Sequence, residues 1–238
     1  MTLNEARSQV AKLNAIFLEK ELAVAVNPAV AFPAGDRTRV SWPQAKDAQG
    51  MFVELTYASI SEYRSFFRGT HYTCLLKDGA LVQISFDFKN ADMVAHRFCF
   101  YPCPLFLPDN LDAIDWDIWN DLLEEALFAE AQALEPSGLG GGSIPTASAI
   151  RLRSPIRFDY ESEEQTASES PSHVHLSDDV ARIPVQSALS LSQFVHFVVL
   201  NFYPSYAEVL DDFAITHFDR CIRQEEEYLL HFDCRRHL

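Results

Sequence analysis

The chain has 238 residues, of which 48% are hydrophobic and 18 are phenylalanine, and its formal net charge is −15 at pH 7. This composition is typical of a folded globular protein and argues against both a disordered chain and a broad basic surface for nucleic-acid backbone. No apolar run approaches the roughly 20 residues of a membrane-spanning helix. The first residues do not resemble a secretory signal, and five cysteines form no dense disulfide framework. We therefore expect a cytoplasmic protein with reduced thiols.

The N-terminal residues 2–22 are predicted to form an amphipathic helix. Thr2 and Glu5 have the spacing of a capping box, and apolar residues recur along one face of the helix. A connection with several prolines follows, and it is expected to contain only short extended pieces. Beyond it, residues 51–57 are predicted to form a strand and residues 61–68 a short helix or turn.

Residues 70–101 are predicted to form an antiparallel meander of three strands. Its clearest strand is 81–88, in which Ile84, Phe86 and their apolar neighbours alternate with polar residues. The Asp78–Gly79 pair before this strand is typical of a tight hairpin turn. The alternation requires that at least one face of the sheet is buried.

An acidic helix is predicted at residues 116–134, with Asp115 as its N-cap. The glycine-rich segment that follows, residues 136–148, is predicted to be a linker or an exposed loop. It would separate an N-terminal lobe, residues 1–135, from a C-terminal lobe, residues 149–238. The two lobes could also belong to one continuous domain.

The C-terminal lobe is predicted to contain strands within residues 149–185, a core helix at 190–202 and one or two closing helices within 205–233. Together with the N-terminal half, this pattern predicts an α+β fold. Antiparallel strands would form one or two sheets, and the N-terminal, acidic and C-terminal helices would pack on one side.

The polar residues best suited to chemistry lie on the strands of the C-terminal lobe. In an extended segment, Arg157 and Asp159 share one face, and Tyr160 points to the other face with the apolar residues. His173 and His175 share a face in the same way. If the two segments pair as an antiparallel hairpin, a histidine should lie within reach of Arg157 or Asp159, and the intervening residues 162–171 should be the most exposed of the lobe.

These residues fit a site for an anion or a phosphate ester. Two histidines could act as an acid–base pair, and arginines would stabilise the developing phosphoryl charge, as in a metal-independent ribonuclease that needs no cofactor. The plainer interpretation is that Arg157 and Asp159 form a structural ion pair and the histidines cap a sheet edge. The predicted catalytic residues are His173, His175, Asp159 and Tyr160, and the predicted anion-binding residues are Arg153, Arg157 and Arg182.

Two weaker alternatives involve a metal ion. His173 and His175 could bind Zn²⁺ if Asp159 or Asp178 completed the site, although no further ligand is obvious. Separately, Asp78, Asp87 and Lys89 fit a loose pattern of Mg²⁺-dependent nucleases in which two carboxylates hold the ion. A hairpin turn also favours an aspartate at position 78, so this pattern is not specific.

Four short segments resemble a bacterial protein family known only as a domain of unknown function. They are Arg157–Tyr160, Ser172–His175, Arg182–Pro184 and Asn201–Tyr203, and with the segment RFCFYPCP the resemblance covers most of the chain. It implies a bacterial cytosolic protein and no assigned activity. The strand pair is also loosely similar to some small toxins of toxin–antitoxin modules, which implies a role in phage defence or as a toxin.

Two hypotheses for the function follow. The first is an effector that acts on RNA, another phosphodiester or a nucleotide through the histidine and arginine residues. The alternative is a non-enzymatic binding subunit, similar to an antitoxin, whose acidic helix 116–134 docks on a basic protein partner. Neither hypothesis involves a membrane.

Overall fold

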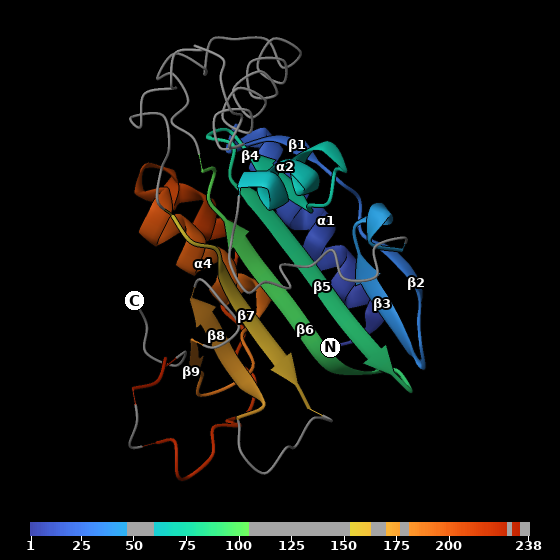
Figure 1. Ribbon diagram of the computed structural model, residues 1–238, viewed down its shortest axis with the longest axis vertical. Helices are drawn as coiled ribbons and strands as arrows, with labels where there is room; N and C mark the ends of the chain where they lie inside the picture. The colour runs from blue at the N-terminus through green and yellow to red at the C-terminus, as the bar shows by residue number, and fades with distance from the viewer. Residues whose placement is uncertain (47–59, 105–152, 163–169, 177–180, 228–229, 234–238) are drawn as a thin grey trace, which may run out of the picture.

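The structure is a computed structural model, and it describes residues 1–46, 60–104, 153–162, 170–176, 181–227 and 230–233 (Figure 1). The helices are α1 (Leu3–Glu19), η1 (Pro43–Lys46), α2 (Ile60–Arg68), α4 (Leu191–Phe202) and η4 (Pro204–Asp212), and the strands are β1 (Ala23–Val26), β2 (Val30–Ala34), β3 (Arg37–Ser41), β4 (Cys74–Leu76), β5 (Leu81–Lys89), β6 (Asp92–Tyr101), β7 (Ile156–Glu161), β8 (Ser172–Leu176) and β9 (Arg182–Pro184). The predicted α+β fold is confirmed. The predicted strand 51–57, acidic helix 116–134 and linker 136–148 lie outside the described residues.

In the described part of the chain, nine strands form one antiparallel sheet with the order β1-β4-β5-β6-β7-β8-β9. Strands β4 and β3 pair with successive parts of the same edge of β5, and β2 pairs with β3. The pairing of β6 with β7 joins strands from both predicted lobes, with Arg97 opposite Asp159. The predicted hairpin is also confirmed, because β7 pairs antiparallel with β8 and places Asp159 opposite His173.

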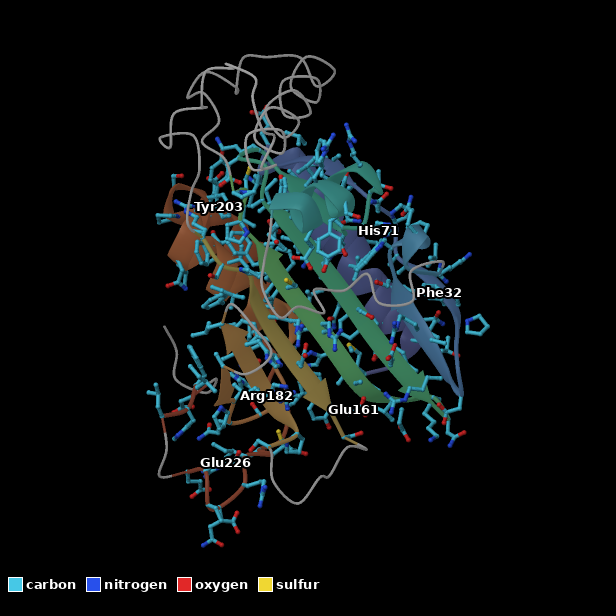
Figure 2. All side chains as sticks on the ribbon, viewed as in Figure 1. Phe32, His71, Glu161, Arg182, Tyr203 and Glu226 are labelled. Atoms are coloured by element: carbon cyan, nitrogen blue, oxygen red, sulfur yellow. The ribbon has the colours of Figure 1, made fainter. Side chains whose placement is uncertain are left out.

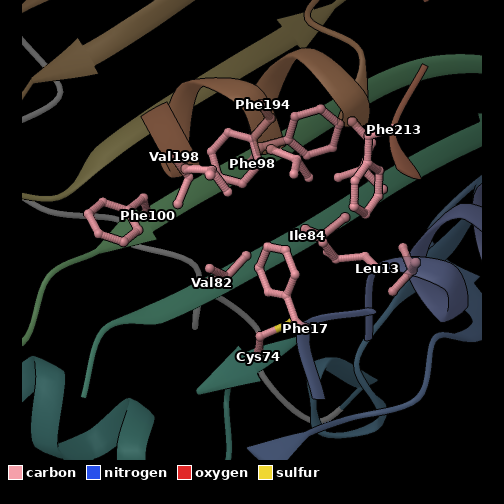
Figure 3. Close-up of a cluster of buried hydrophobic side chains, with 14 of the residues drawn as sticks. Leu13, Phe17, Cys74, Val82, Ile84, Phe98, Phe100, Phe194, Val198 and Phe213 are labelled. Atoms are coloured by element: carbon pink, nitrogen blue, oxygen red, sulfur yellow. The ribbon is translucent and has the colours of Figure 1, made fainter. Parts of the chain in front are cut away.

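The hydrophobic core lies between one face of this sheet and helices α1 and α4 (Figure 3). Ile84 of β5 and Phe98 of β6 are each at most 1% exposed and lie at its centre. Leu13 and Phe17 of α1 pack on this face, as does Phe194 of α4, whose ring centroid is 5.5 Å from that of Phe98. Helices α1 and α4 cover the same side of the sheet, as the sequence predicts, whereas α2 packs on the opposite face, where Phe66 contacts Tyr101 of β6.

The opposite face of the sheet is polar, yet much of it is also buried. Gln83, Ser85 and Asp87 of β5 are at most 8% exposed. Buried polar groups must find partners, and here Gln83 Nε2 donates to the carbonyl of His71 while Asp87 accepts two hydrogen bonds from Arg39. The continuation of this face over β6, β7 and β8 holds the candidate site.

Two further segments can be compared with the sequence prediction. In residues 23–41 the expected short extended pieces are the strands β1, β2 and β3, and Pro33 fits within β2 because that strand is paired only with β3 among the described residues. Of the one or two closing helices predicted within 205–233, the described residues contain one, and it is a 3-10 helix and not an α-helix. Pro204 begins the 3-10 helix η4, and beyond Asp212 the described chain is held by isolated bridges such as Val185–Phe232. The described residues include no helix both long and apolar enough to cross a bilayer.

Candidate functional site

Five side chains from three neighbouring strands meet on the polar face of the sheet. Arg97 lies on β6, Arg157 and Asp159 lie on β7, and His173 and His175 lie on β8. The register places Asp159 between Arg97 and His173 and places Arg157 opposite His175. Directly paired residues share a face of an antiparallel sheet, so the register alone brings the five together. We call these five residues the polar cluster.

Asp159 is at the centre of the polar cluster. Its Oδ1 accepts a hydrogen bond of 3.1 Å from Arg97 Nε, and its Oδ2 accepts one of 2.9 Å from Arg157 Nε. Nε2 of His175 lies 3.5 Å from the same Oδ2. Arg157, Asp159 and His175 are at most 9% exposed, so these charges interact with little screening by water. One carboxylate thus binds two guanidiniums and lies beside an imidazole.

The charge of Asp159 is maintained by its neighbours. Burial alone would raise the pKa of its carboxyl, but Arg97, His175 and Arg157 outweigh this effect and hold the pKa well below its usual range. Asp159 is therefore ionised throughout the neutral range. It can act as an acceptor or a ligand but cannot serve as a general acid near pH 7.

His173 lies half-buried at the side of the polar cluster. Its Nδ1 is 3.4 Å from the carbonyl oxygen of Ser170. A carbonyl only accepts hydrogen bonds, so Nδ1 carries the proton of the neutral ring and Nε2 carries the lone pair. Burial lowers the pKa of His173. The negative charge of Asp159 opposes this shift, and the positive charge of Arg182 adds to it. The neutral imidazole is thus available as a base or as a metal ligand.

The surroundings of the polar cluster are positively charged, in contrast to the acidic chain. Arg182 of β9 is exposed, lies opposite His175 and shares its face of the sheet. The guanidiniums of Arg97 and Arg157 both bind Asp159, and Arg182 lies beside His175. The side chain of Arg97 is 33% exposed and that of Arg157 is 8% exposed.

Two predicted site residues lie elsewhere. Tyr160 points to the opposite face of β7, where its ring centroid is 5.5 Å from that of His96. Alternation along a strand causes this, because Tyr160 directly follows Asp159. Arg153 is exposed before β7 begins, and its charge acts on Tyr203. Figure 2 shows Tyr203 near one end of the sheet, away from Arg182 and Glu161.

In the predicted magnesium pattern, Asp78 lies at the opposite end of β5 from Asp87 and Lys89. Asp78 lies in the turn before β5, where it accepts hydrogen bonds from Ala80 N and the Tyr203 hydroxyl. Six extended residues separate the start of β5 from Asp87, a span of roughly 20 Å. Lys89 pairs with Asp36 beyond that point. Their separation argues against a shared metal ion.

The zinc alternative fits the geometry better. One possible ligand atom from each of Asp159, His173 and His175 lies within 4.8 Å of the other two. Asp178, the other carboxylate considered for this site, lies outside the described residues. The structure therefore brings three metal-ligating groups of suitable chemistry together at the centre of the polar cluster.

Arg97 is the residue of the polar cluster that the sequence prediction omits. It lies two positions before Cys99, and the alternation of β6 indicates that both share the polar face. That pattern cannot reveal that β6 pairs with β7, more than fifty residues later in the chain. Cys99 lies opposite Arg157, but burial raises the pKa of its thiol to about 12, so it stays protonated and is not a nucleophile here.

Comparison with known proteins identifies the family of the chain. Residues 24–234 match the model of an uncharacterised conserved protein family, DUF2290. The match covers most of the chain, which therefore belongs to this family, and the predicted resemblance to a domain of unknown function is confirmed. No match is found among curated proteins or among solved structures.

Proposed function

We propose that this member of the DUF2290 family binds and hydrolyses a phosphate ester, in RNA or in a nucleotide, at the polar cluster. The observation that supports the proposal most is the arrangement around Asp159, where guanidiniums and imidazoles from separate strands converge on one face. The cytoplasmic setting is part of the proposal on the composition and the cysteine pattern, and the bacterial source and a role in phage defence or a toxin–antitoxin module are part of it on the sequence resemblance alone.

The arginines supply the positive charge that such a reaction requires. A guanidinium presents several N–H donors in a planar fork that matches phosphate oxygens, and positive charge that is already in place stabilises the transition state. Asp159 holds the Nε groups of Arg97 and Arg157. A guanidinium carries five N–H donors, so one arginine can hold a carboxylate and a phosphate at the same time. Arg182, which is exposed and lies opposite His175, adds a third positive charge.

The histidines provide the means to activate the nucleophile. In hydrolysis, the oxygen of water forms a bond to phosphorus, the ester P–O bond breaks, and the departing oxygen takes a proton. Nε2 of His173 carries a lone pair in the neutral ring, and His175 lies beside it with ring centroids 4.7 Å apart. Both imidazoles are therefore near the guanidiniums that would hold the phosphate.

The proposal is tested by cleavage assays on purified protein. Labelled RNA, single-stranded DNA and bis(p-nitrophenyl) phosphate are incubated with the wild type and with Arg97→Gln, which keeps a polar side chain but loses the charge. We expect at least one substrate to be cleaved and Arg97→Gln to lower kcat/KM about 100-fold or more. If the wild type cleaves none of these substrates, the proposal is wrong.

A matched control separates a functional arginine from a structural one. Arg37 forms a bidentate ion pair with Glu161 in the described structure, outside the polar cluster. Arg37→Gln also breaks an interstrand ion pair, but it should leave kcat/KM unchanged. Equal losses in Arg37→Gln and Arg97→Gln would support the plainer interpretation that these ion pairs only stabilise the sheet.

The alternative of an acidic binding subunit stays a prediction. Its proposed docking element, helix 116–134, lies outside the described residues, and its support is the net charge of −15. A basic protein partner that co-purifies with the chain at low salt and dissociates at high salt, with no cleavage in the assays above, would favour this alternative.

A further inference from the structure

We propose that Asp159, His173 and His175 together bind one divalent transition-metal ion of the zinc class. The reaction that the ion serves rests on the proposed function above, whereas the site itself rests on the geometry of these three residues. The ion would replace direct proton transfer by the histidines as the means of activating water.

The distance between His175 and Asp159 is the first argument. Nε2 and Oδ2 are 3.5 Å apart. A well-formed hydrogen bond between nitrogen and oxygen spans about 2.7–3.2 Å. Two ligand atoms on a tetrahedral zinc ion, each bound at about 2.1 Å, are about 3.4 Å apart. The separation in the structure therefore suits two atoms that share a metal ion.

The orientation of the ligands is the second argument. The Nδ1 proton of His173 is directed to the Ser170 carbonyl, which leaves the lone pair on Nε2. Metal-binding histidines commonly make such a contact through the other ring nitrogen, because it fixes the tautomer and the ring. The hydrogen bonds from Arg97 and Arg157 orient the Asp159 carboxylate in a comparable way. Each carboxylate oxygen has two lone pairs, so a ligand position remains beside each hydrogen bond.

The donor set identifies the class of ion. Two imidazoles and one carboxylate suit zinc, cobalt or iron(II), whereas magnesium and calcium prefer oxygen ligands. Three protein ligands leave a coordination position for water or for a phosphate oxygen, as in catalytic zinc sites. Metal-bound water would lose a proton to solvent, the resulting hydroxide would attack phosphorus, and the ester oxygen would leave with a proton from solvent.

The neighbouring arginines make a distinctive prediction about affinity. A divalent cation beside Arg97, Arg157 and Arg182 is repelled by them, so metal alone should bind more weakly than in a neutral surrounding. A phosphate ion that contacts both the metal and the guanidiniums offsets this repulsion. Metal and phosphate should therefore strengthen one another's binding by the same factor, which we expect to be about tenfold.

The experiment uses Co²⁺ as the probe, because its d–d absorption reports coordination directly. Metal-free wild-type protein is titrated with Co²⁺, with and without inorganic phosphate, and bound metal is counted by equilibrium dialysis. We expect one ion per chain, visible absorption typical of four- or five-coordinate cobalt, and a Kd about tenfold lower with phosphate. His173→Gln and His175→Gln should each weaken binding at least 30-fold, and His196→Gln, on α4, should not.

The folding of each variant is checked by far-UV circular dichroism. Because His173 is only half-buried, His173→Gln should fold and can still test the metal site if His175→Gln does not fold. The absence of cobalt binding by the wild type, or equal binding by wild type and His173→Gln, would overturn the metal site. Cleavage that continues in EDTA without metal binding would overturn the metal site and leave the proposed function standing. One bound ion without any cleavage would support the metal site and contradict the proposed function.

Discussion

His96 shows how a single polar residue can be placed in the core of this sheet. It lies on the apolar face of β6 at 3% exposure, and its ring stacks on Phe98 with a centroid distance of 4.3 Å. Neither of its ring nitrogens hydrogen-bonds to another of the described residues. Burial lowers its pKa to about 3, because the charged ring would lose its hydration. The folded protein therefore holds His96 in the neutral form.

We expect His96→Phe to make the protein more resistant to acid. The unfolded chain binds a proton on His96 below about pH 6.5 and the folded chain does so only near pH 3, so stability is complete above pH 6.5 and falls as the pH drops between these values. At pH 5 the loss amounts to about 2 kcal/mol. Urea unfolding at pH 7 and pH 5 should show a smaller difference for His96→Phe than for the wild type.

The control for this prediction is Phe98→Leu, which alters the stacking partner of His96 but removes no titrating group. It should lower the free energy of unfolding by a similar amount at both pH values. If His96→Phe lost as much stability as the wild type between pH 7 and pH 5, another group would be responsible for the acid sensitivity.

At the residue scale, the sequence is informative about faces and uninformative about distant partners. Alternation correctly places Arg157 with Asp159 and His173 with His175, and the predicted hairpin correctly brings the two pairs together. Arg97 could not be added to the site, because its position depends on a pairing between β6 and β7 that local pattern does not encode. Arg153 does not join the polar cluster, because β7 begins only at Ile156 and Arg153 precedes it.

Both long helices of the described structure begin with a capping box. At α1, Thr2 and Glu5 exchange side-chain and backbone hydrogen bonds, and at α4, Ser190 and Gln193 do the same. Local spacing predicts these two starts correctly because the interaction spans three residues. The surroundings differ, however, since Ser190 is 3% exposed and Thr2 is exposed. A buried cap leaves its backbone donors without water when it is removed.

We therefore expect Ser190→Ala to destabilise the protein more than Thr2→Ala. The loss should be about 1–2 kcal/mol for Ser190→Ala and about 0.5 kcal/mol for Thr2→Ala, because water can replace the hydroxyl only at the exposed cap. The measurement is urea unfolding of the two variants beside the wild type. Equal losses, or a larger loss for Thr2→Ala, would show that burial of the cap does not determine its contribution.

The same contrast between local and non-local signals explains which elements the sequence predicts. The strand at 81–88, the helix at 190–202 and the short helix at 61–68 follow from alternation and helical spacing, and the structure confirms them. The burial of Gln83 and Asp87 does not follow, because it depends on segments packed against the polar face. Of the one or two helices expected within 205–233, only η4 is present among the described residues, and the chain beyond Asp212 forms bridges to Val185 and Ser187 instead.

At the scale of the whole molecule, the continuous sheet connects the residues on either side of the glycine-rich segment. Strand β6 lies in the predicted N-terminal lobe and β7 in the predicted C-terminal lobe, and six residue pairs join them. The core is shared in the same way, since Phe158 of β7 packs on Phe194 of α4, which also contacts Phe98 of β6. A shared core and a shared sheet favour cooperative unfolding.

This arrangement predicts that a core mutation in one predicted lobe also destabilises the other predicted lobe. All three tryptophans of the chain, Trp42, Trp116 and Trp119, lie within residues 1–135, so their fluorescence reports only on the predicted N-terminal lobe. Phe158→Ala removes a 3% exposed ring from the predicted C-terminal lobe and should cost about 3–5 kcal/mol. Urea unfolding followed by tryptophan fluorescence and by far-UV circular dichroism should show one transition, shifted equally for both signals. A fluorescence midpoint that stays at the wild-type value while the circular dichroism signal shifts would instead show two independent folding units, because cooperative coupling through β6 and β7 cannot move one signal alone.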